Sequence, residues 1–320
     1  MPHLFLRPHG NLGNRMMQIV TAERLRQDVD GLSYSGYNIP YWNFKNGRIR
    51  KNRPPLPRIL TQDIDINAVK IMMTEGELPL SVLRCIVLQC DFWGDPDYFR
   101  SFFPSLVVPP QRTNDDELLI NVRGAEILKA RSTAYGPIPV AYYERIIAET
   151  GLKPVFLGQL GNDYNTKLLQ SRFPKARFVK SQGVLEDFEA IRGARNIVIS
   201  LSSFSWLAAW LSKADTIHMP LLGMFNPSQR PDISLAPAQD ARFKFSHFPV
   251  REWVGSDAQI EDLAKSDPSE IIDTERLKAL QADAKARRKV QREAAMQALS
   301  VRARRIKPYE TLLKWAYPQG

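Results

Sequence analysis

Short apolar runs alternate with segments of helical periodicity along most of the chain, which predicts parallel sheets covered by helices. In the first part, an apolar segment at residues 4–6 precedes a Gly/Asn loop and a helical pattern that begins near Met16, and residues 83–89 form a second apolar run. We expect both apolar segments to be strands of a first doubly wound unit. Residues 34–57 show no sustained period and predict an irregular surface segment.

The same alternation recurs after residues 109–117, a polar segment rich in breakers that we interpret as a linker. Strands are expected at 118–122, 152–160, 176–181 and 196–200, and helices near 139–149 and at 164–173, 185–195 and 204–211. After residue 219 the pattern becomes irregular until a long helix from Asp273 or Thr274 to about residue 307. The predicted fold class is α/β, with two Rossmann-like domains (1–115 and 116–250) facing a cleft and a basic helical tail (251–320).

Residues 196–211 change halfway from a strand pattern to a helical one, and small hydroxyl residues stand at the junction. Ser202 and Ser203 can cap the helix that includes Phe204. The backbone N–H groups of that helix start also make a site for phosphate. An ordinary serine cap on a buried helix is the alternative.

Arg123 follows directly on the predicted strand 118–122. In open parallel sheets the ligand crevice lies beyond the carboxyl ends of the strands, so this guanidinium is placed to hold a diphosphate. A surface salt bridge between Arg123 and Glu126 is the alternative, with equal weight.

Two further patterns have weaker signals. The loop that contains Gly10, Asn11, Gly13 and Asn14 allows close backbone approach to a ligand, but plain turns have the same composition. Two D-x-D pairs match a metal-diphosphate pattern, although helix capping explains the second pair without a metal; the pairs are Asp63/Asp65 and Asp95/Asp97.

The net charge of +10 is concentrated near the end of the chain, because residues 275–307 contain eleven Lys or Arg and three Asp or Glu. Contact with an anionic membrane surface or with nucleic acid is one interpretation of this tail, and a solvated helix packed on its own protein is the other. Aromatic residues are absent between residue 274 and Tyr309, so stacking on bases is not expected. Cys85 and Cys90 are expected on opposite faces of one strand, where they cannot easily form a disulfide.

Four separated blocks resemble the bacterial α-1,2-fucosyltransferases in their order: NLGNRMMQ, FWGDPDYF, INVRGAEI and ISLSSFSWLAAWL. The last block is similar to that family's S-N-S-S-F-S-W-W-x-A-W-L. The resemblance covers roughly residues 4–227. It implies two Rossmann-like domains of the GT-B type, GDP-fucose as donor, no required metal, and inversion at the anomeric carbon.

The resemblance also implies roles for individual residues. Arg123 would bind the β-phosphate and stabilise the leaving diphosphate, with Glu126 as the nearest carboxylate. The serine-rich motif would face the donor, and the N-terminal loop would close on donor and acceptor from the other domain. The expected catalytic residues are Arg123, Glu126 and Asn14, and the expected donor-binding residues are Asn11, Gly13, Asn14, Arg123, Gly124, Gln159, Ser202, Ser203 and Phe204.

Several positions depart from the family pattern. Asn121 stands for its His, Gly124 for its second Arg, and Arg15 for the Gln after Asn14, while Gly158-Gln159 replaces an S-D-D. The resemblance therefore supports the fold more strongly than it supports GDP-fucose as the donor. We expect a cytoplasmic enzyme, in contact with the membrane only at its surface, that acts on a bacterial surface glycan. One alternative is a glycosyltransferase that uses a different nucleotide-sugar donor or depends on a metal. The other is a non-enzymatic protein that binds anionic surfaces or nucleic acid.

Overall fold

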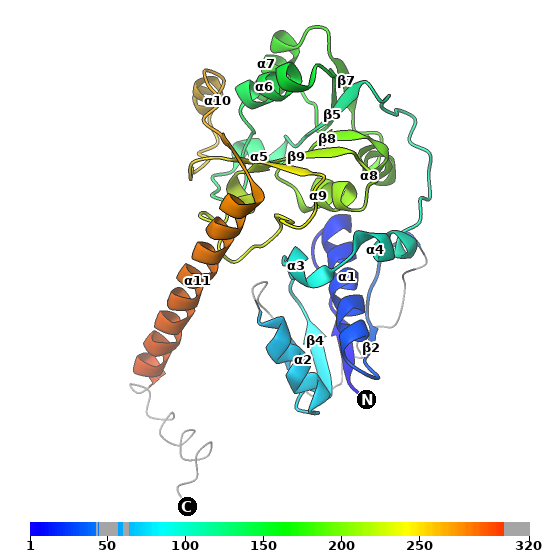
Figure 1. The fold of residues 1–320 in the computed structure, drawn as a ribbon, viewed down its shortest axis with the longest axis vertical. Helices are drawn as coiled ribbons and strands as arrows, with labels where there is room; N and C mark the ends of the chain where they lie inside the picture. Colours follow the sequence, from blue (N-terminus) through cyan, green and yellow to red (C-terminus); the bar gives the residue numbers. More distant parts are fainter. Residues whose placement is uncertain (43, 45–56, 60–63, 304–320) are drawn as a thin grey trace, which may run out of the picture.

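A computed structural model describes residues 1–42, 44, 57–59 and 64–303. The backbone forms two parallel sheets with helices against them, one near each end of the molecule (Figure 1). The first sheet has the strand order β2-β1-β4-β3 and consists of β1 (His3–Leu6), β2 (Ser33–Ser35), β3 (Arg58–Ile59) and β4 (Leu80–Leu83). Its helices are α1 (Leu12–Asp28), α2 (Ile66–Thr74), α3 (Cys90–Trp93) and α4 (Pro96–Phe102).

The second sheet has seven strands in the order β11-β10-β9-β8-β5-β6-β7, and every strand except β11 runs parallel to its neighbours. The strands are β5 (Glu117–Val122), β6 (Lys153–Gly158), β7 (Arg177–Lys180), β8 (Asn196–Val198), β9 (Thr216–Leu221), β10 (Phe243–His247) and β11 (Glu270–Ile272). The helical elements are α5 (Glu126–Lys129), α6 (Val140–Thr150), α7 (Tyr164–Arg172), α8 (Val184–Gly193), α9 (Ser203–Trp210), η1 (Gly223–Phe225), α10 (Asp257–Leu263) and α11 (Thr274–Ala303).

The order of the second sheet locates its ligand crevice. Numbered from β5 in chain order, the six parallel strands follow the doubly wound sequence 3-2-1-4-5-6, which reverses direction between β5 and β8. Ligands of such sheets bind beyond the strand ends at this switch point. The fold class predicted from the sequence, two Rossmann-like α/β domains facing a cleft, is confirmed.

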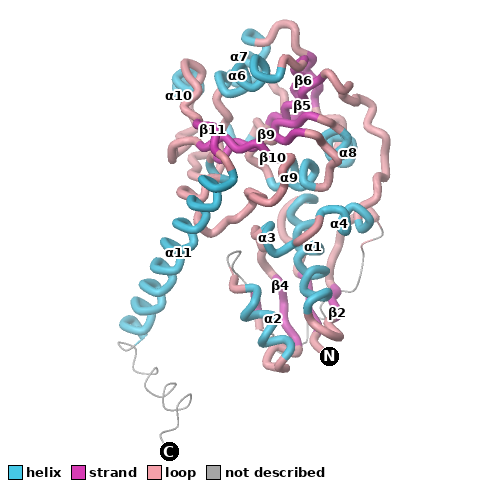
Figure 2. The backbone as a smooth tube through the Cα atoms, in the orientation of Figure 1, coloured by secondary structure: helices cyan, strands magenta, loops and turns pink. Residues whose placement is uncertain are grey.

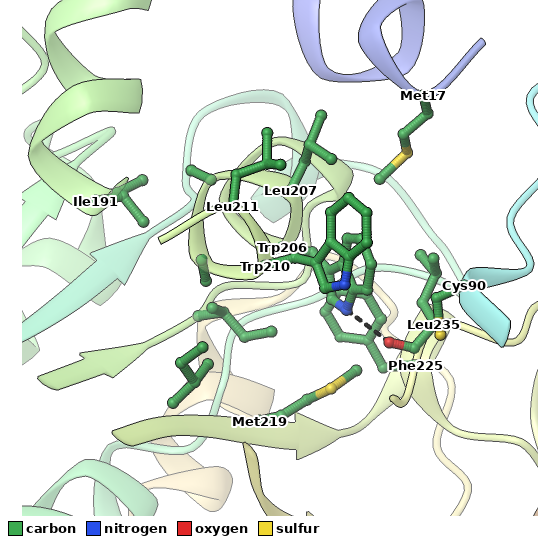
Figure 3. Close-up of a cluster of buried hydrophobic side chains, with 14 of the residues drawn as sticks. Met17, Cys90, Ile191, Trp206, Leu207, Trp210, Leu211, Met219, Phe225 and Leu235 are labelled. Atoms are coloured by element: carbon green, nitrogen blue, oxygen red, sulfur yellow. Dashed lines mark hydrogen bonds between the residues drawn. The ribbon is translucent and has the colours of Figure 1, made fainter. Parts of the chain in front are cut away.

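An apolar core joins the two domains. Trp206 and Trp210, one helical turn apart on α9, stack with ring centroids 5.7 Å apart, and Trp93 of α3 packs edge-on against both. The indole N–H of Trp206 donates to the carbonyl of Leu235 at 2.6 Å, and Met17 of α1 lies near the same rings (Figure 3). All three indoles are buried, so α9 is held from both domains.

The C-terminal end of α9 is also fixed across the domain junction. Arg100 of α4 donates to the carbonyls of Leu211 and Ser212 at 2.9 and 2.6 Å. Arg242 donates to the carbonyl of Trp210 at 3.0 Å. Cations at this end satisfy free carbonyls and complement the helix dipole. The opposite, N-terminal end of α9 therefore points toward the switch point with a fixed direction.

Several elements differ from the sequence-based expectation. The strand expected at 83–89 is wrong: β4 ends at Leu83, and Val87 and Leu88 are buried in a loop. Cys85 and Cys90 do not share a strand, since Cys90 begins α3; both are buried and they form no disulfide with each other. The region after residue 219 contains β10, α10 and β11, and β11 extends the second sheet beyond residue 250, the boundary predicted for that domain.

Helix α11 leaves the second domain and runs beside the first domain (Figures 1 and 2). Asp273 precedes it and accepts from the amide of Arg276 at 2.7 Å, as expected for a cap. Leu277 and Ala284 are buried, whereas Val290 is exposed. No helix among residues 1–42 and 64–303 is both long and apolar enough to span a bilayer.

Candidate active site

A cavity of about 500 Å³ lies between the two domains at the switch point. It is lined from the second domain by the ends of β5, β6 and β8, and from the first domain by the start of α1. Nine residues predicted for the site line it, namely Asn11, Gly13, Asn14, Arg123, Glu126, Gln159, Ser202, Ser203 and Phe204. This volume falls within the range of small-ligand sites. Gly124 is not among the lining residues.

The serine-rich segment forms a capped helix start, as its sequence predicts. Ser202 has extended backbone geometry, and its hydroxyl accepts from the amide of Phe204 at 3.2 Å. Ser203 is the first residue of α9 and lines the cavity. Both interpretations of this segment are thus compatible: the cap is made, and the N-terminal end of α9, with its partial positive charge, still opens on the cavity.

A buried chain of polar side chains holds the three strand ends together. The hydroxyl of Ser200 donates to Asn121 Oδ1 at 2.6 Å, and Asn121 Nδ2 donates to the carbonyl of Leu157 at 3.2 Å. Ser205 lies 3.0 Å from Ser200, oxygen to oxygen. Because these groups are buried and satisfy one another, they set the spacing between β5, β6 and β8. The sequence indicates Asn121 only as a departure from the family pattern and gives no signal of this structural role.

Arg123 lies at the centre of the second domain's wall. Its Nη1 donates to the carbonyl of Leu201, the residue before Ser202, at 3.3 Å. Its guanidinium carbon lies 4.8 Å from the ring centroid of Tyr135, and Nη2 lies 3.3 Å from Glu126 Oε1. The arginine therefore reaches the start of α9, and the ion pair with Glu126 also forms. The Arg123 side chain is 27% exposed and lines the cavity, so it is accessible to an anion.

The turn after β5 is held in a demanding conformation. Ala125 has φ 51°, a region that residues with a Cβ rarely adopt. The amide of Gly124 donates to Gln159 Oε1 at 3.0 Å, and a Cβ on Gly124 would lie 2.7 Å from the carbonyl oxygen of Gln159. Gly124 and Gln159 thus position the turn that presents Arg123 and Glu126. Such strain is characteristic of functional sites.

The first domain contributes the start of α1, which abuts the start of α9. The hydroxyl of Ser203 donates to Asn14 Oδ1 at 2.6 Å. A Cβ on Gly13 would lie 2.9 Å from Phe204 Cα and 3.2 Å from Phe204 N, so only glycine permits this approach. The prediction that Gly13 and Asn14 belong to a loop is wrong: both lie in the first turn of α1, and Asn11 occupies the position before it.

Arg15 was noted only as a departure from the family pattern, and it also lines the cavity. Its Nε donates to the carbonyl of Gly10 at 2.9 Å and its Nη1 to the carbonyl of Asn38 at 3.3 Å. Neither acceptor is charged. The first domain therefore adds a second guanidinium to the positive potential of Arg123 and the α9 start. Tyr41, from the segment 34–57 that was expected to be irregular and on the surface, lines the cavity as well.

Two carboxylates face the cavity. Glu126 is largely exposed, whereas Asp187 is 9% exposed and accepts from the amide of Gln182 at 3.0 Å. Asp187 was not among the predicted residues; it lies in the first turn of α8, and only the fold brings that turn to the cavity. Of the two, Glu126 is the more accessible proton acceptor.

The described members of the two D-x-D pairs do not line this cavity, and their side chains make local contacts. Asp65 accepts from the amide of Ala68 and begins α2, and Asp95 accepts from the amide of Asp97 and begins α4. Asp97 pairs with Arg100. Asp63 lies outside the described residues. Within the part of the chain that the structure describes, no group of three His, Cys, Asp or Glu side chains could hold a metal ion.

Comparisons with known proteins add only a distant likeness. No protein-family model and no curated protein matches the chain. One solved structure that matches is that of an arginine-to-lysine mutant of FUT1 from Arabidopsis thaliana in complex with GDP. The two are 11% identical with a TM-score of 0.41, over 84% of this chain and 74% of that chain. A likeness this distant carries no conclusion about activity.

Proposed function

We propose that this chain is a glycosyltransferase that transfers a sugar from a nucleoside diphosphate donor, with GDP-fucose as the favoured donor. The observation that carries the proposal is the convergence of Arg123 with the start of α9 at the switch point between β5 and β8. A donor of this kind leaves as a diphosphate, whose developing negative charge needs fixed positive groups. The preference for GDP-fucose rests on the four sequence blocks alone.

The residues support an inverting displacement in one step. The acceptor hydroxyl oxygen would bond to the anomeric carbon as the bond from that carbon to the diphosphate oxygen breaks. The hydroxyl proton would pass to a base, for which Glu126 is the accessible carboxylate of the cavity. The electron pair of the broken bond would stay on the diphosphate, facing Arg123 and the amides of α9.

The first domain would complete the site. Two residues of α1 place polar groups opposite the second domain's wall, where an acceptor hydroxyl would enter. They are Asn14, which is hydrogen-bonded to Ser203, and Arg15. We propose a bacterial surface glycan or a related oligosaccharide as the acceptor, reached in the cytoplasm or at the inner membrane surface. Charge neutralisation by Arg123 and α9 would make a metal ion unnecessary, and assays with and without EDTA test this part.

A thermal-shift screen tests the donor class. The panel comprises GDP, GDP-fucose, UDP, UDP-glucose and CMP, each at saturating concentration. Ligand at 100 times its Kd stabilises the folded state by about 2.7 kcal/mol. The proposal predicts that GDP and GDP-fucose selectively raise the melting temperature. A response confined to UDP or CMP compounds would keep a transferase but reject the guanosine donor, and no response to any nucleotide would reject the proposed function.

A further inference from the structure

Arg15 is a cation of the candidate active site that has no counter-ion within the part of the chain that the structure describes. It lines the cavity, and its hydrogen bonds go to the carbonyls of Gly10 and Asn38, at 2.9 and 3.3 Å. Those acceptors are neutral, and the first turn of α1 contains no acid. The two bonds use two of the five N–H groups of the guanidinium. Its charge and its other donors therefore remain for a ligand.

The side chain of Arg15 points back toward the start of α1. Long side chains on a helix lean toward its N-terminus, and the Nε of Arg15 reaches the carbonyl of Gly10, which precedes the helix. The same end of α1 meets the start of α9, since Asn14 Oδ1 accepts from the hydroxyl of Ser203 at 2.6 Å. The guanidinium of Arg15 is therefore directed to the end of α1 where the two helix starts meet.

Arg123 reaches the start of α9 from the second domain. Its Nη1 donates to the carbonyl of Leu201, and its charge is shared with Glu126, whose Oε1 lies 3.3 Å from Nη2. Asp187, another acid of the cavity, accepts from a backbone amide, and among the described residues it forms no ion pair with either arginine. An anion at the start of α9 would therefore meet one arginine that already has a carboxylate partner and one that has none.

A departing diphosphate needs more positive charge than Arg123 and α9 supply. Negative charge develops on the diphosphate as its bond to the sugar breaks. The ion pair with Glu126 offsets part of the charge of Arg123, and a helix start contributes only about half an elementary charge. Arg15 adds a full positive charge to the same cavity, with unused donors that suit phosphate oxygens.

We propose that Arg15 binds the diphosphate of the donor directly, so that each domain holds the same anion through one arginine. The contact rests on the proposed function, because a nucleoside diphosphate is its ligand. A purely structural role, in which Arg15 only ties residues 10 and 38 to α1, would leave its charge without a partner in the cavity. Binding of an anionic acceptor by Arg15 is a different outcome of the same test.

Three variants of the full-length protein test the contact: Arg15→Gln, Arg15→Lys and Arg112→Gln. Arg112 is exposed in the segment between the domains and does not line the cavity, so its variant removes an equal charge elsewhere. The ligands are GDP and guanosine, which has the same base and sugar but no phosphate. Their affinities are measured by displacement of a fluorescent GDP analogue, and melting temperatures report whether the anchoring of Gly10 and Asn38 matters for stability.

Arg15→Gln should weaken GDP binding about tenfold, equivalent to about 1.4 kcal/mol, and guanosine binding less than about twofold. Arg15→Lys keeps the charge without the planar fork and should recover part of the loss, while Arg112→Gln should bind both ligands as the wild type does. Equal losses for GDP and guanosine would assign Arg15 a structural role. Unchanged GDP affinity with a raised KM for the acceptor would assign it to the acceptor. Either result would overturn the inference.

Failure of this contact and failure of the proposed function give different results. Equal binding of GDP by the wild type and by Arg15→Gln rejects the contact and leaves a nucleotide-dependent transferase in place. A wild type that binds no nucleotide of the thermal-shift panel rejects the proposed function, and the contact with it. If that panel selects UDP, then UDP and uridine replace GDP and guanosine in the same comparison.

Discussion

The contact between the starts of α1 and α9 makes Gly13→Ala an informative perturbation. The added methyl carbon would lie 2.9 Å from Phe204 Cα, 3.2 Å from Phe204 N and 3.4 Å from Ser203 C. All three are backbone atoms, so no side chain can rotate away, and α1 must move relative to α9. Overpacking of this kind costs about 1–3 kcal/mol. The better helix propensity of alanine returns up to about 1 kcal/mol.

From the middle of the overpacking range, about 2 kcal/mol, the net cost to the domain contact is then about 1–2 kcal/mol, equivalent to about a 5- to 30-fold change in an equilibrium constant. Because Asn14 moves with α1, its hydrogen bond with Ser203 should lengthen and the cavity should lose its shape. We therefore expect Gly13→Ala to weaken GDP binding by about that factor in isothermal titration calorimetry.

Gly193→Ala provides the control. Gly193 ends α8, and no heavy atom would lie within 4 Å of its added Cβ. This variant should bind GDP as the wild type does and should be unchanged or slightly more stable. If Gly13→Ala bound GDP with wild-type affinity and melted at the wild-type temperature, the close contact between the two helix starts would not shape the site.

Three further predictions concern the hydrogen bond between Asn14 and Ser203, the burial of His218, and the metal requirement. In a double-mutant cycle, Asn14→Ala and Ser203→Ala should show a coupling energy of about 0.5–1.5 kcal/mol in GDP binding; additive effects would contradict a functional hydrogen bond. Burial, with the nearby charges of Arg145 and Lys244, lowers the pKa of His218 to about 4. In the unfolded chain this histidine has a pKa near 6.5, so it takes up a proton at a higher pH there than in the folded protein. The His218 contribution to the free energy of unfolding should therefore be complete above pH 6.5 and fall by about 3 kcal/mol as the pH drops toward 4. Denaturant titrations of the wild type and of His218→Gln measure this loss, which the variant should lack. Transfer activity should persist in EDTA and gain nothing from Mn²⁺; loss with EDTA and rescue by Mn²⁺ would support a metal-dependent donor site.

Sequence patterns predict residues 117–210 of the second domain well because the signals there are local. The apolar runs that become β5, β6, β7 and β8 are short and bounded by polar residues, and Asp163 and Ser202 cap the helices that follow them. Arg123 and the serine segment could be placed at strand ends for the same reason. Their convergence follows from the strand order, which local patterns do not contain.

The errors also have physical causes. Pro220 made its segment look irregular, yet it lies in β9. The pairing of β9 with β8 ends at His218, so the N–H that Pro220 lacks removes no hydrogen bond between these two strands. The run at 83–89 is buried by packing in a loop rather than by pairing. Gly13 and Asn14 are poor helix formers, but the close approach of α9 requires a small residue in that turn.

Other site residues could not be found from local sequence. Asn14 and Ser203 are 189 positions apart, and Asn121 and Ser200 are 79 apart. Their hydrogen bonds depend on the arrangement of two domains and of two non-consecutive strands. Arg15 carried a signal, since it departs from the family pattern within an otherwise similar block.

Calorimetry of GDP binding to the wild type and to Arg123→Ala decides whether this guanidinium holds the diphosphate. We expect GDP to bind the wild type and the variant, while folded with an unchanged melting temperature, to lose about 10- to 150-fold in affinity, the equivalent of a charge-assisted hydrogen bond of about 1.5–3 kcal/mol. Equal affinities for GDP in the two proteins would contradict it.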